Sequence, residues 1–226
     1  MNNREKTGRL VVIEGLDGSG KGTQAKLLAE SFRREGGEIR QISFPDYDSP
    51  SSALVKMYLA GEFGESASAV NAYAASSFYA VDRFASFHTD WKKDYEAGCL
   101  ILADRYVTSN IIYQLGKLPQ EQWDEYMAWL QDFEYNRLAL PQPDQVIFLD
   151  MPIGLSQQLI SGRYHGDESR KDIHERDLRF LREAETSARY AAKRLGWQIV
   201  HCAQGDAPRS VEAIHEEIKA CVMKIR

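Results

Sequence analysis

Residues 10–24 read LVVIEGLDGSGKGTQ: an apolar run, a glycine-rich turn and the start of an amphipathic segment. The apolar run predicts a buried strand, and residues 21–35 predict a helix. Glycines let the backbone curl until successive N–H groups surround a phosphate, and the helix adds the positive end of its dipole. Lys21 can reach the transferring phosphates as a mobile point charge. The succession of strand, loop and helix predicts a phosphate-binding loop (P-loop), whereas a solvated glycine-rich turn would leave the glycines unexplained.

The position after Lys21 departs from the usual loop, in which a Ser or Thr hydroxyl binds magnesium. Gly22 occupies it, and the hydroxyl of Thr23 comes one residue later. We therefore expect phosphate oxygens, water and nearby carboxylates to hold most of the Mg²⁺ that accompanies ATP. The residues expected to bind ATP are Gly15, Leu16, Asp17, Gly18, Ser19, Gly20, Lys21, Gly22 and Thr23.

Beyond this loop, short apolar runs alternate with longer amphipathic ones, which is typical of a parallel sheet with crossover helices. Strands are predicted at residues 10–13, 39–44, 99–103, 146–149 and 197–201. Helices are predicted at residues 21–35, 52–97 (with a break near 61–64), 109–115, 120–138, 173–195 and after 210. The prediction is an α/β fold of the P-loop NTPase class: one domain over residues 1–226, with a doubly wound five-stranded parallel sheet and helices on both faces.

Composition narrows the classes of function. The net charge of −5 argues against a broad basic surface for nucleic acid. No apolar run reaches the roughly 18 residues of a membrane span, and the polar residues 1–8 do not resemble a secretory signal, so we expect a cytoplasmic protein. Cys99, Cys202 and Cys221 lack metal-ligand spacing, and the first two fall in strand-like runs, which predicts reduced core residues.

Asp104-Arg105-Tyr106 follows the third predicted strand. Ligands of open α/β sheets bind beyond the carboxyl ends of the strands, so these side chains are expected at the site. Arg105 can hold an acceptor phosphate through two parallel bonds, and Asp104 can accept a hydrogen bond from a water of the magnesium shell. A local Asp–Arg ion pair at the strand end is the alternative.

A family resemblance rests on these motifs. Asp104-Arg105-Tyr106-x-x-Ser109, followed by Tyr113-Gln114, resembles the motif of thymidylate kinases, and residues 20–24 resemble the loop of nucleoside monophosphate kinases. The resemblance covers nearly the whole chain, with one departure at Ile112, where the family usually has Ala. It implies transfer of the γ-phosphoryl group of ATP to dTMP with Mg²⁺, by a homodimer that binds neither nucleic acid nor membrane.

The resemblance also implies an acceptor pocket. Its expected residues are Asp17, Phe44, Pro45, Tyr47, Tyr79, Arg83, Arg105, Asn110 and Tyr113. Asp17 is expected near the acceptor sugar and the metal, with Asp104 as a second, water-mediated metal contact.

Individual roles in this pocket follow from the same resemblance. Tyr79 is expected to stack on the base and Arg83 to bond a base oxygen, because the two lie four apart on a predicted helix. Asn110 is expected to contact the N3 edge, and Tyr113 to crowd a ribose 2′-hydroxyl. The alternative makes Tyr79 a core residue and Arg83 a surface charge. Asp46 replaces a frequently basic residue, which would leave more of the phosphate binding to Arg105.

The polar stretch at about residues 163–171 resembles the family's mobile lid over ATP. The phosphate loop has no arginine at its variable positions, so the lid is expected to supply cationic charge to the transferring group. Arg163 and Arg170 are the expected catalytic cations beside Lys21 and Arg105, with Lys171 third; a solvated charged loop is the alternative. Glu175 matches an acidic position that, in some family members, lies near the acceptor sugar.

Two other functions stay open at this level. One is a kinase for another nucleoside monophosphate or for a free deoxynucleoside. The other is a regulatory protein that binds ATP without turning over a small acceptor, which would have no need for the residues on the acceptor side.

Overall fold

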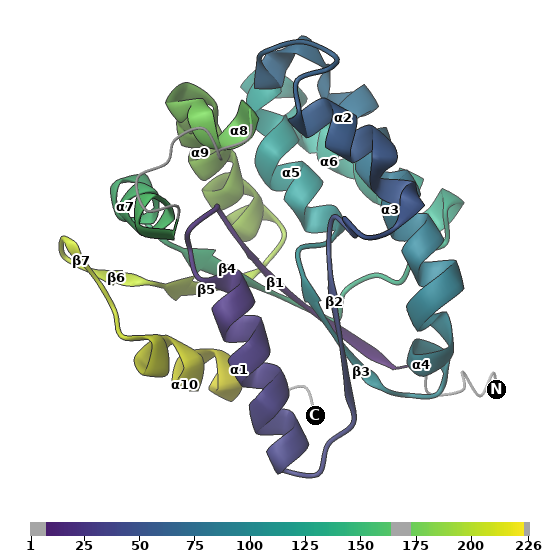
Figure 1. Ribbon diagram of the computed structural model, residues 1–226, viewed down its shortest axis with the longest axis vertical. Helices are drawn as coiled ribbons and strands as arrows, with labels where there is room; N and C mark the ends of the chain where they lie inside the picture. Colours follow the sequence, from purple (N-terminus) through teal and green to yellow (C-terminus); the bar gives the residue numbers. More distant parts are fainter. Residues whose placement is uncertain (1–7, 164–172, 224–226) are drawn as a thin grey trace.

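The computed structural model describes residues 8–163 and 173–223 of the chain. One sheet of five parallel strands forms its centre (Figure 1). In spatial order the strands are β2 (Ile39–Ser43), β3 (Leu100–Asp104), β1 (Arg9–Gly15), β4 (Gln145–Asp150) and β5 (Gln198–His201). All five predicted strands are therefore confirmed.

The central strand β1 is buried because it has a neighbour on each side and a helical layer on each face. Val12 pairs with Ala103 of β3 and with Val146 of β4, and the residues from Leu10 to Ile13 have no exposed surface. A parallel strand covered on both faces reads as a continuous apolar run, which explains the clear signal in the sequence. The last residue of β1, Gly15, consequently emerges at the middle of the sheet's carboxyl edge.

Helices cover both faces of the sheet, as predicted. On one face, α1 (Lys21–Arg34) and α10 (Val211–Val222) pack side by side against alternate residues of β1 (Figure 1). On the other face lie α3 (Ala72–Ser86), α5 (Val107–Gln114), α6 (Trp123–Gln131) and α9 (Leu178–Arg194). The remaining helices are α2 (Ala53–Leu59), α4 (Lys92–Glu96), α7 (Ile153–Arg163) and α8 (Ile173–Arg176).

The continuous helix predicted over residues 173–195 is wrong. It is divided into α8 and α9 at Asp177, whose side chain accepts a hydrogen bond from the Phe180 N–H at 3.0 Å and so caps the second helix. The divided helix allows α8 to reach the site while α9 follows the sheet.

The helix predicted over residues 120–138 also needs correction. Its α-helical part ends at Gln131 and continues as one π-helical turn, Asp132–Arg137. Trp123, Met127 and Leu130 are core residues as predicted, but Phe133 is only half-buried and Glu134 is fully buried in its place. A carboxylate therefore enters the apolar layer.

Three smaller differences concern the remaining segments. The helical region 52–97 contains α2, α3, a π-helical turn at Phe87–Trp91 and α4, with a longer break before α3 than predicted. Cys99 is half-buried and not part of the core, whereas Cys202 is buried as predicted; both are free thiols. Strands β6 (Ala203–Gln204) and β7 (Ala207–Pro208) form a short hairpin that the sequence did not reveal.

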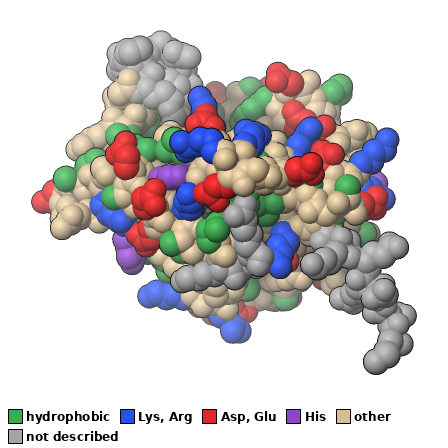
Figure 2. Space-filling view, turned by 90° about the horizontal axis from the view of Figure 1, so that it is seen from below, with side chains coloured by type: hydrophobic (Ala, Val, Ile, Leu, Met, Phe, Trp, Pro, Cys, Tyr) green, Lys and Arg blue, Asp and Glu red, His purple; other side chains and the backbone are tan. Residues whose placement is uncertain are grey.

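Within the described residues, no helix combines the length and apolar character that crossing a membrane requires. The face shown in Figure 2 carries acidic and basic side chains in alternation, and no large basic area gathers on it.

Candidate active site

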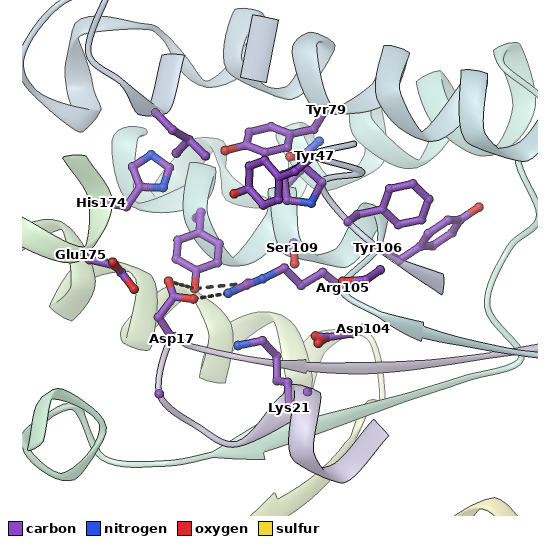
Figure 3. Close-up of a pocket in the computed structure, with 18 of the residues that line it drawn as sticks. Asp17, Lys21, Tyr47, Tyr79, Asp104, Arg105, Tyr106, Ser109, His174 and Glu175 are labelled. Carbon is purple, nitrogen blue, oxygen red and sulfur yellow. Dashed lines mark hydrogen bonds and ion pairs between the residues drawn. The ribbon is translucent and has the colours of Figure 1, made fainter. Parts of the chain in front are cut away.

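A cavity of about 600 Å³ opens at the carboxyl edge of the sheet, beside the ends of β1, β2 and β3. Most of the predicted site residues line it: Asp17, Gly18, Gly20, Lys21, Gly22, Thr23, Phe44, Pro45, Tyr47, Tyr79, Arg83, Asp104, Arg105, Asn110 and Tyr113. Gly15, Leu16 and Ser19 belong to the same loop but do not line the cavity. In Figure 3, Lys21 and Asp17 lie at one side, Tyr47 and Tyr79 at the other, and Arg105 extends between them.

The glycines of the phosphate loop are required by its backbone. Gly18 and Gly20 have φ angles of 78° and 91°, in the left-handed region that other residues rarely adopt. A side chain at Gly18 would also collide with α7, because its Cβ would lie 2.4 Å from the carbonyl oxygen of Ser156. The loop thus turns tightly from β1 into α1, which begins at Lys21.

Lys21 is the cation of the loop. It is 7% exposed, and its Nζ donates a hydrogen bond to the Leu16 carbonyl at 2.8 Å. Burial and the charge of Arg105 lower the pKa of Lys21 to about 8, although Asp17 and Asp104 oppose the shift. The ammonium therefore loses its proton more readily than an ordinary lysine.

Asp17, Arg105 and Tyr113 form a network at the centre of the cavity (Figure 3). Arg105 donates to one carboxylate oxygen of Asp17, and the Tyr113 hydroxyl donates to the other at 2.9 Å. Burial raises the pKa of Asp17, but the charges of Arg105 and Lys21 outweigh it and lower the pKa to about 2. Asp17 is thus ionised at neutral pH and holds the guanidinium at the cavity.

The backbone of Arg105 adopts an unusual conformation, which hydrogen bonds to β1 stabilise. Its φ angle is 68°, and its N–H donates to the Ile13 carbonyl at 3.1 Å. The fully buried carboxylate of Glu14 accepts hydrogen bonds from the Tyr106 N–H and from the hydroxyls of Thr108 and Ser109, at 3.1, 2.7 and 2.9 Å. Glu14 therefore fixes the turn that presents Arg105, a role that the sequence analysis missed.

The structure explains why glycine, and not serine or threonine, follows Lys21. A Cβ at Gly22 would lie 3.3 Å from Oδ2 of Asp104, so this carboxylate borders the space where a serine or threonine would project. The other oxygen, Oδ1, is buried and has no hydrogen-bond partner among the described residues. A buried carboxylate oxygen without a partner, beside Gly22 of the phosphate loop, fits a magnesium ion bound through water.

The same described residues contain no cluster of three or more His, Cys, Asp or Glu side chains able to enclose a metal. Mg²⁺ does not require such a cluster, because it keeps several waters and binds through one or two carboxylates together with substrate phosphates.

A second group of polar residues lies at the end of the cavity away from Lys21. Arg83 is 1% exposed and donates from Nε and from a terminal nitrogen to the two oxygens of Glu134, each at 2.6 Å. Asn110 donates from Nδ2 to Glu134 and to the Ser76 carbonyl, each at 3.2 Å. Arg83 and Asn110 both line the cavity, so the alternative that Arg83 is a surface charge is wrong.

Comparison with known proteins identifies the family to which the chain belongs. The model of the family described as thymidylate kinase matches residues 13–218. The chain belongs to the thymidylate kinase family. A thymidylate kinase of Mycobacterium tuberculosis is 34% identical over 186 residues, which cover 80% of this chain and 84% of that protein. A probable thymidylate kinase of Thermococcus gammatolerans is 30% identical over 217 residues, covering 95% and 96%.

A solved structure agrees at the level of the fold. The thymidylate kinase of Candida albicans superposes with a TM-score of 0.69, covering 96% of this chain and 92% of that one, at 22% sequence identity. This likeness confirms the predicted P-loop α/β fold with its five-stranded parallel sheet.

Ile112, the departure from the thymidylate kinase motif, is accommodated by the core. It is fully buried on α5, and its carbonyl accepts a hydrogen bond from the Ser187 hydroxyl of α9 at 2.6 Å. The larger side chain thus packs in the layer between these helices.

His174 belongs to the cavity lining and was not assigned from the sequence. It lies at the start of α8, where its ring stacks on Tyr113 with 5.8 Å between centroids, and its Nε2 lies 2.9 Å from the Tyr58 hydroxyl. Burial, with Lys117 nearby, lowers the pKa of His174 to about 3, so the ring is neutral. An isolated histidine carries no pattern in the sequence that predicts this position.

Glu175, Ser109 and Gln114 also line the cavity; the position of Glu175 near the acceptor sugar stays a prediction. The candidates from the predicted lid cannot be assigned a place at the site. Arg163 is the last residue of α7, but its side chain and residues 164–172, which include Arg170 and Lys171, lie outside the described part of the chain.

Proposed function

We propose that this chain transfers the γ-phosphoryl group of ATP to dTMP, giving dTDP and ADP. One observation supports it above the others: a single cavity joins the phosphate loop, with Lys21, to a polar end that carries Arg83 and Asn110. A protein of the thymidylate kinase family that only bound ATP would have no use for the second end.

The acceptor's own phosphate oxygen is the nucleophile in this reaction. Phosphate is already ionised at neutral pH, so no general base is required, and catalysis consists of alignment and charge stabilisation. Arg105 would bind the acceptor phosphate through its forked donors, and Lys21 would stabilise charge on the transferring group. Arg163 and Arg170 stay the predicted sources of further positive charge.

The base and sugar would lie at the other end of the cavity. Tyr79 would stack on the base, Arg83 would donate to a base oxygen, and Asn110 would contact the N3 edge. Tyr113 occupies the centre, close to Asp17, where its ring would crowd a ribose 2′-hydroxyl. Phe44, Pro45 and Tyr47 would line the passage between base and phosphate.

The test is ADP release from Mg·ATP with dTMP, dUMP, UMP, CMP, AMP, GMP and thymidine, each at equal concentration. The fastest turnover is expected with dTMP, with little from UMP or thymidine. Faster turnover with another acceptor would overturn the roles of Arg83, Asn110 and Tyr113. Tight ATP binding without turnover of any acceptor would favour a regulatory protein.

Magnesium would be held through water by Asp104 and Asp17, and it would neutralise charge on the phosphates of bound ATP. Asp104→Asn is expected to raise the Mg²⁺ concentration for half-maximal rate about 10–100-fold, the usual cost of losing an outer-shell partner. The measurement is a Mg²⁺ titration of the rate at fixed ATP. Asp48→Asn, at an exposed loop position, is the control; equal Mg²⁺ requirements in the two variants would contradict the assignment.

A homodimer is also part of the proposal. Tyr73, Val81 and Phe84 expose large apolar side chains on α3, at 38%, 51% and 40%. Apolar groups gathered on one helix face are suited to a second copy of the chain. Sedimentation equilibrium is expected to give twice the chain mass, and Val81→Glu to give the single mass. A monomeric parent chain at micromolar concentration would refute the dimer.

A further inference from the structure

Glu134 stands out among the buried charges because it touches both residues that face the proposed base. It has no exposed surface and is presented by the π-helical turn Asp132–Arg137. It forms a forked ion pair with Arg83 and accepts a hydrogen bond from Asn110. Burying a carboxylate is costly unless it is paired and hydrogen-bonded, and this one is both.

The surroundings of Asn110 determine the orientation of its amide. The two partners on one side of the amide are the carboxylate of Glu134 and the carbonyl oxygen of Ser76, each 3.2 Å from Nδ2. Both partners only accept hydrogen bonds, so the NH₂ group must face them. The carbonyl oxygen Oδ1 is then the polar atom that Asn110 offers to the cavity it lines.

The surroundings of Arg83 determine which donor is offered. Glu134 takes Nε and one terminal nitrogen at 2.6 Å each, and the other terminal nitrogen has only a long bond, 3.4 Å, to the Tyr106 carbonyl. A guanidinium has five N–H donors and no acceptor. The nitrogen NH1 therefore retains a donor for a ligand in the cavity.

We propose that Glu134 is a positioning residue that sets base specificity, by holding an acceptor at Asn110 and a donor at Arg83. The inference rests on the proposed function and deepens it. A 4-oxopyrimidine such as thymine or uracil offers the complementary pair, an N3–H donor and an O4 acceptor. Cytosine offers the opposite pair, a bare N3 and a 4-amino donor, and so meets two mismatched groups.

These two mismatches predict strong discrimination against cytosine nucleotides in favour of 4-oxopyrimidine nucleotides. A buried polar group left without a partner is costly, and sites built around substrate hydrogen bonds reject the mismatched analogue by about 10⁴–10⁵-fold. The discrimination requires that Asn110 cannot rotate its amide. The Glu134 carboxylate and the Ser76 carbonyl both oppose the rotation, because the rotated amide would turn its own oxygen toward them. The carboxylate opposes it more strongly, because it is charged.

The test compares dUMP with dCMP, which differ only at N3 and the 4-position. Glu134→Gln replaces the carboxylate with an amide of the same shape that can donate to a rotated Asn110. The ratio of kcat/KM for dUMP to that for dCMP is expected to fall at least tenfold. Glu134→Asp keeps the charge and is expected to retain more of the ratio than the Gln variant does.

Tyr126→Phe is the matched control. It removes a hydroxyl that lies 2.5 Å from Ser76 Oγ in the same buried region but leaves every partner of the Asn110 amide in place. The control is expected to keep the parental ratio. Equal losses with dUMP and dCMP in Glu134→Gln, with a lowered Tm, would mean a structural role only and would overturn the inference.

Calorimetric binding of dUMP and dCMP separates this inference from the proposed function. If the parent chain binds dUMP in preference to dCMP and Glu134→Gln loses that preference, but dTMP is not turned over, the proposed function fails and the inference stands. If the parent chain binds both equally, the inference fails whatever the enzyme turns over. Binding to Glu134→Asp provides the same comparison if the Gln variant does not fold.

Discussion

Lys21→Ala is expected to lower kcat by about 10²–10³-fold, the usual cost of removing one preorganised charge-stabilising donor from an active site. The buried ammonium lies at the start of α1, where it would meet charge that develops on the transferring group. The measurement is steady-state ADP formation with saturating Mg·ATP and dTMP. Lys26→Ala, an exposed lysine of the same helix, is the control and is expected to keep the parental kcat. A parental kcat in Lys21→Ala would refute the role.

The pH dependence is a second measurement of the same group. The kcat/KM for ATP reports the free enzyme, in which the pKa of Lys21 is lowered to about 8. The protonated form is the one that binds phosphate, so kcat/KM for ATP is expected to fall as the pH rises through about 8. Bound phosphates favour the charged form, so kcat at saturation should persist to higher pH. Lys21→Ala should lose this alkaline limb.

Arg105→Ala is expected to reduce kcat/KM for dTMP by about 100-fold, since a charged hydrogen-bonding partner contributes about 1.5–3 kcal/mol. The loss should appear mainly in the KM for dTMP, with the KM for ATP nearly unchanged, because the guanidinium lies between the phosphate loop and the base end (Figure 3). Asp17 would also lose the partner that lowers its pKa.

The measurement is the KM for each substrate at saturating concentration of the other. Arg40→Ala is a suitable control, because Arg40 makes its ion pairs with Asp90 and Asp94 on the surface. An unchanged affinity for dTMP in Arg105→Ala would refute the phosphate-binding role, whereas an equal loss for ATP would indicate a general disturbance of the cavity.

The parts of the fold that the sequence predicts are those encoded locally. The phosphate loop follows from glycines at φ angles that few other residues adopt, and β1 from a strand buried on both faces. The division of residues 173–195 at Asp177 was missed because one aspartate within a highly charged segment is not a clear signal of a helix cap. The π-helical turn that buries Glu134 in place of Phe133 was missed because helical periodicity assumes an unbroken α-helix.

The site residues also fall into those that the sequence could predict and those that it could not. Residues in contiguous motifs, such as Asp104 and Arg105, could be predicted together because the end of one strand carries them. Glu14 and Glu134 could not, because each acts on partners far along the chain: Glu134 lies 51 residues from Arg83 and 24 from Asn110. Only the packing of α3, α5 and the π-helical turn brings these three together.

The left-handed backbone of Arg105 carries a conformational cost that its ion pair offsets. For a residue with a side chain such a conformation costs about 1–2 kcal/mol, which glycine would not incur. Glycine would avoid this conformational cost but would leave the Asp17 carboxylate without the guanidinium that pairs with it. The arginine therefore keeps its charge at the cavity at this conformational cost, with its turn fixed by Glu14 and its guanidinium paired with Asp17.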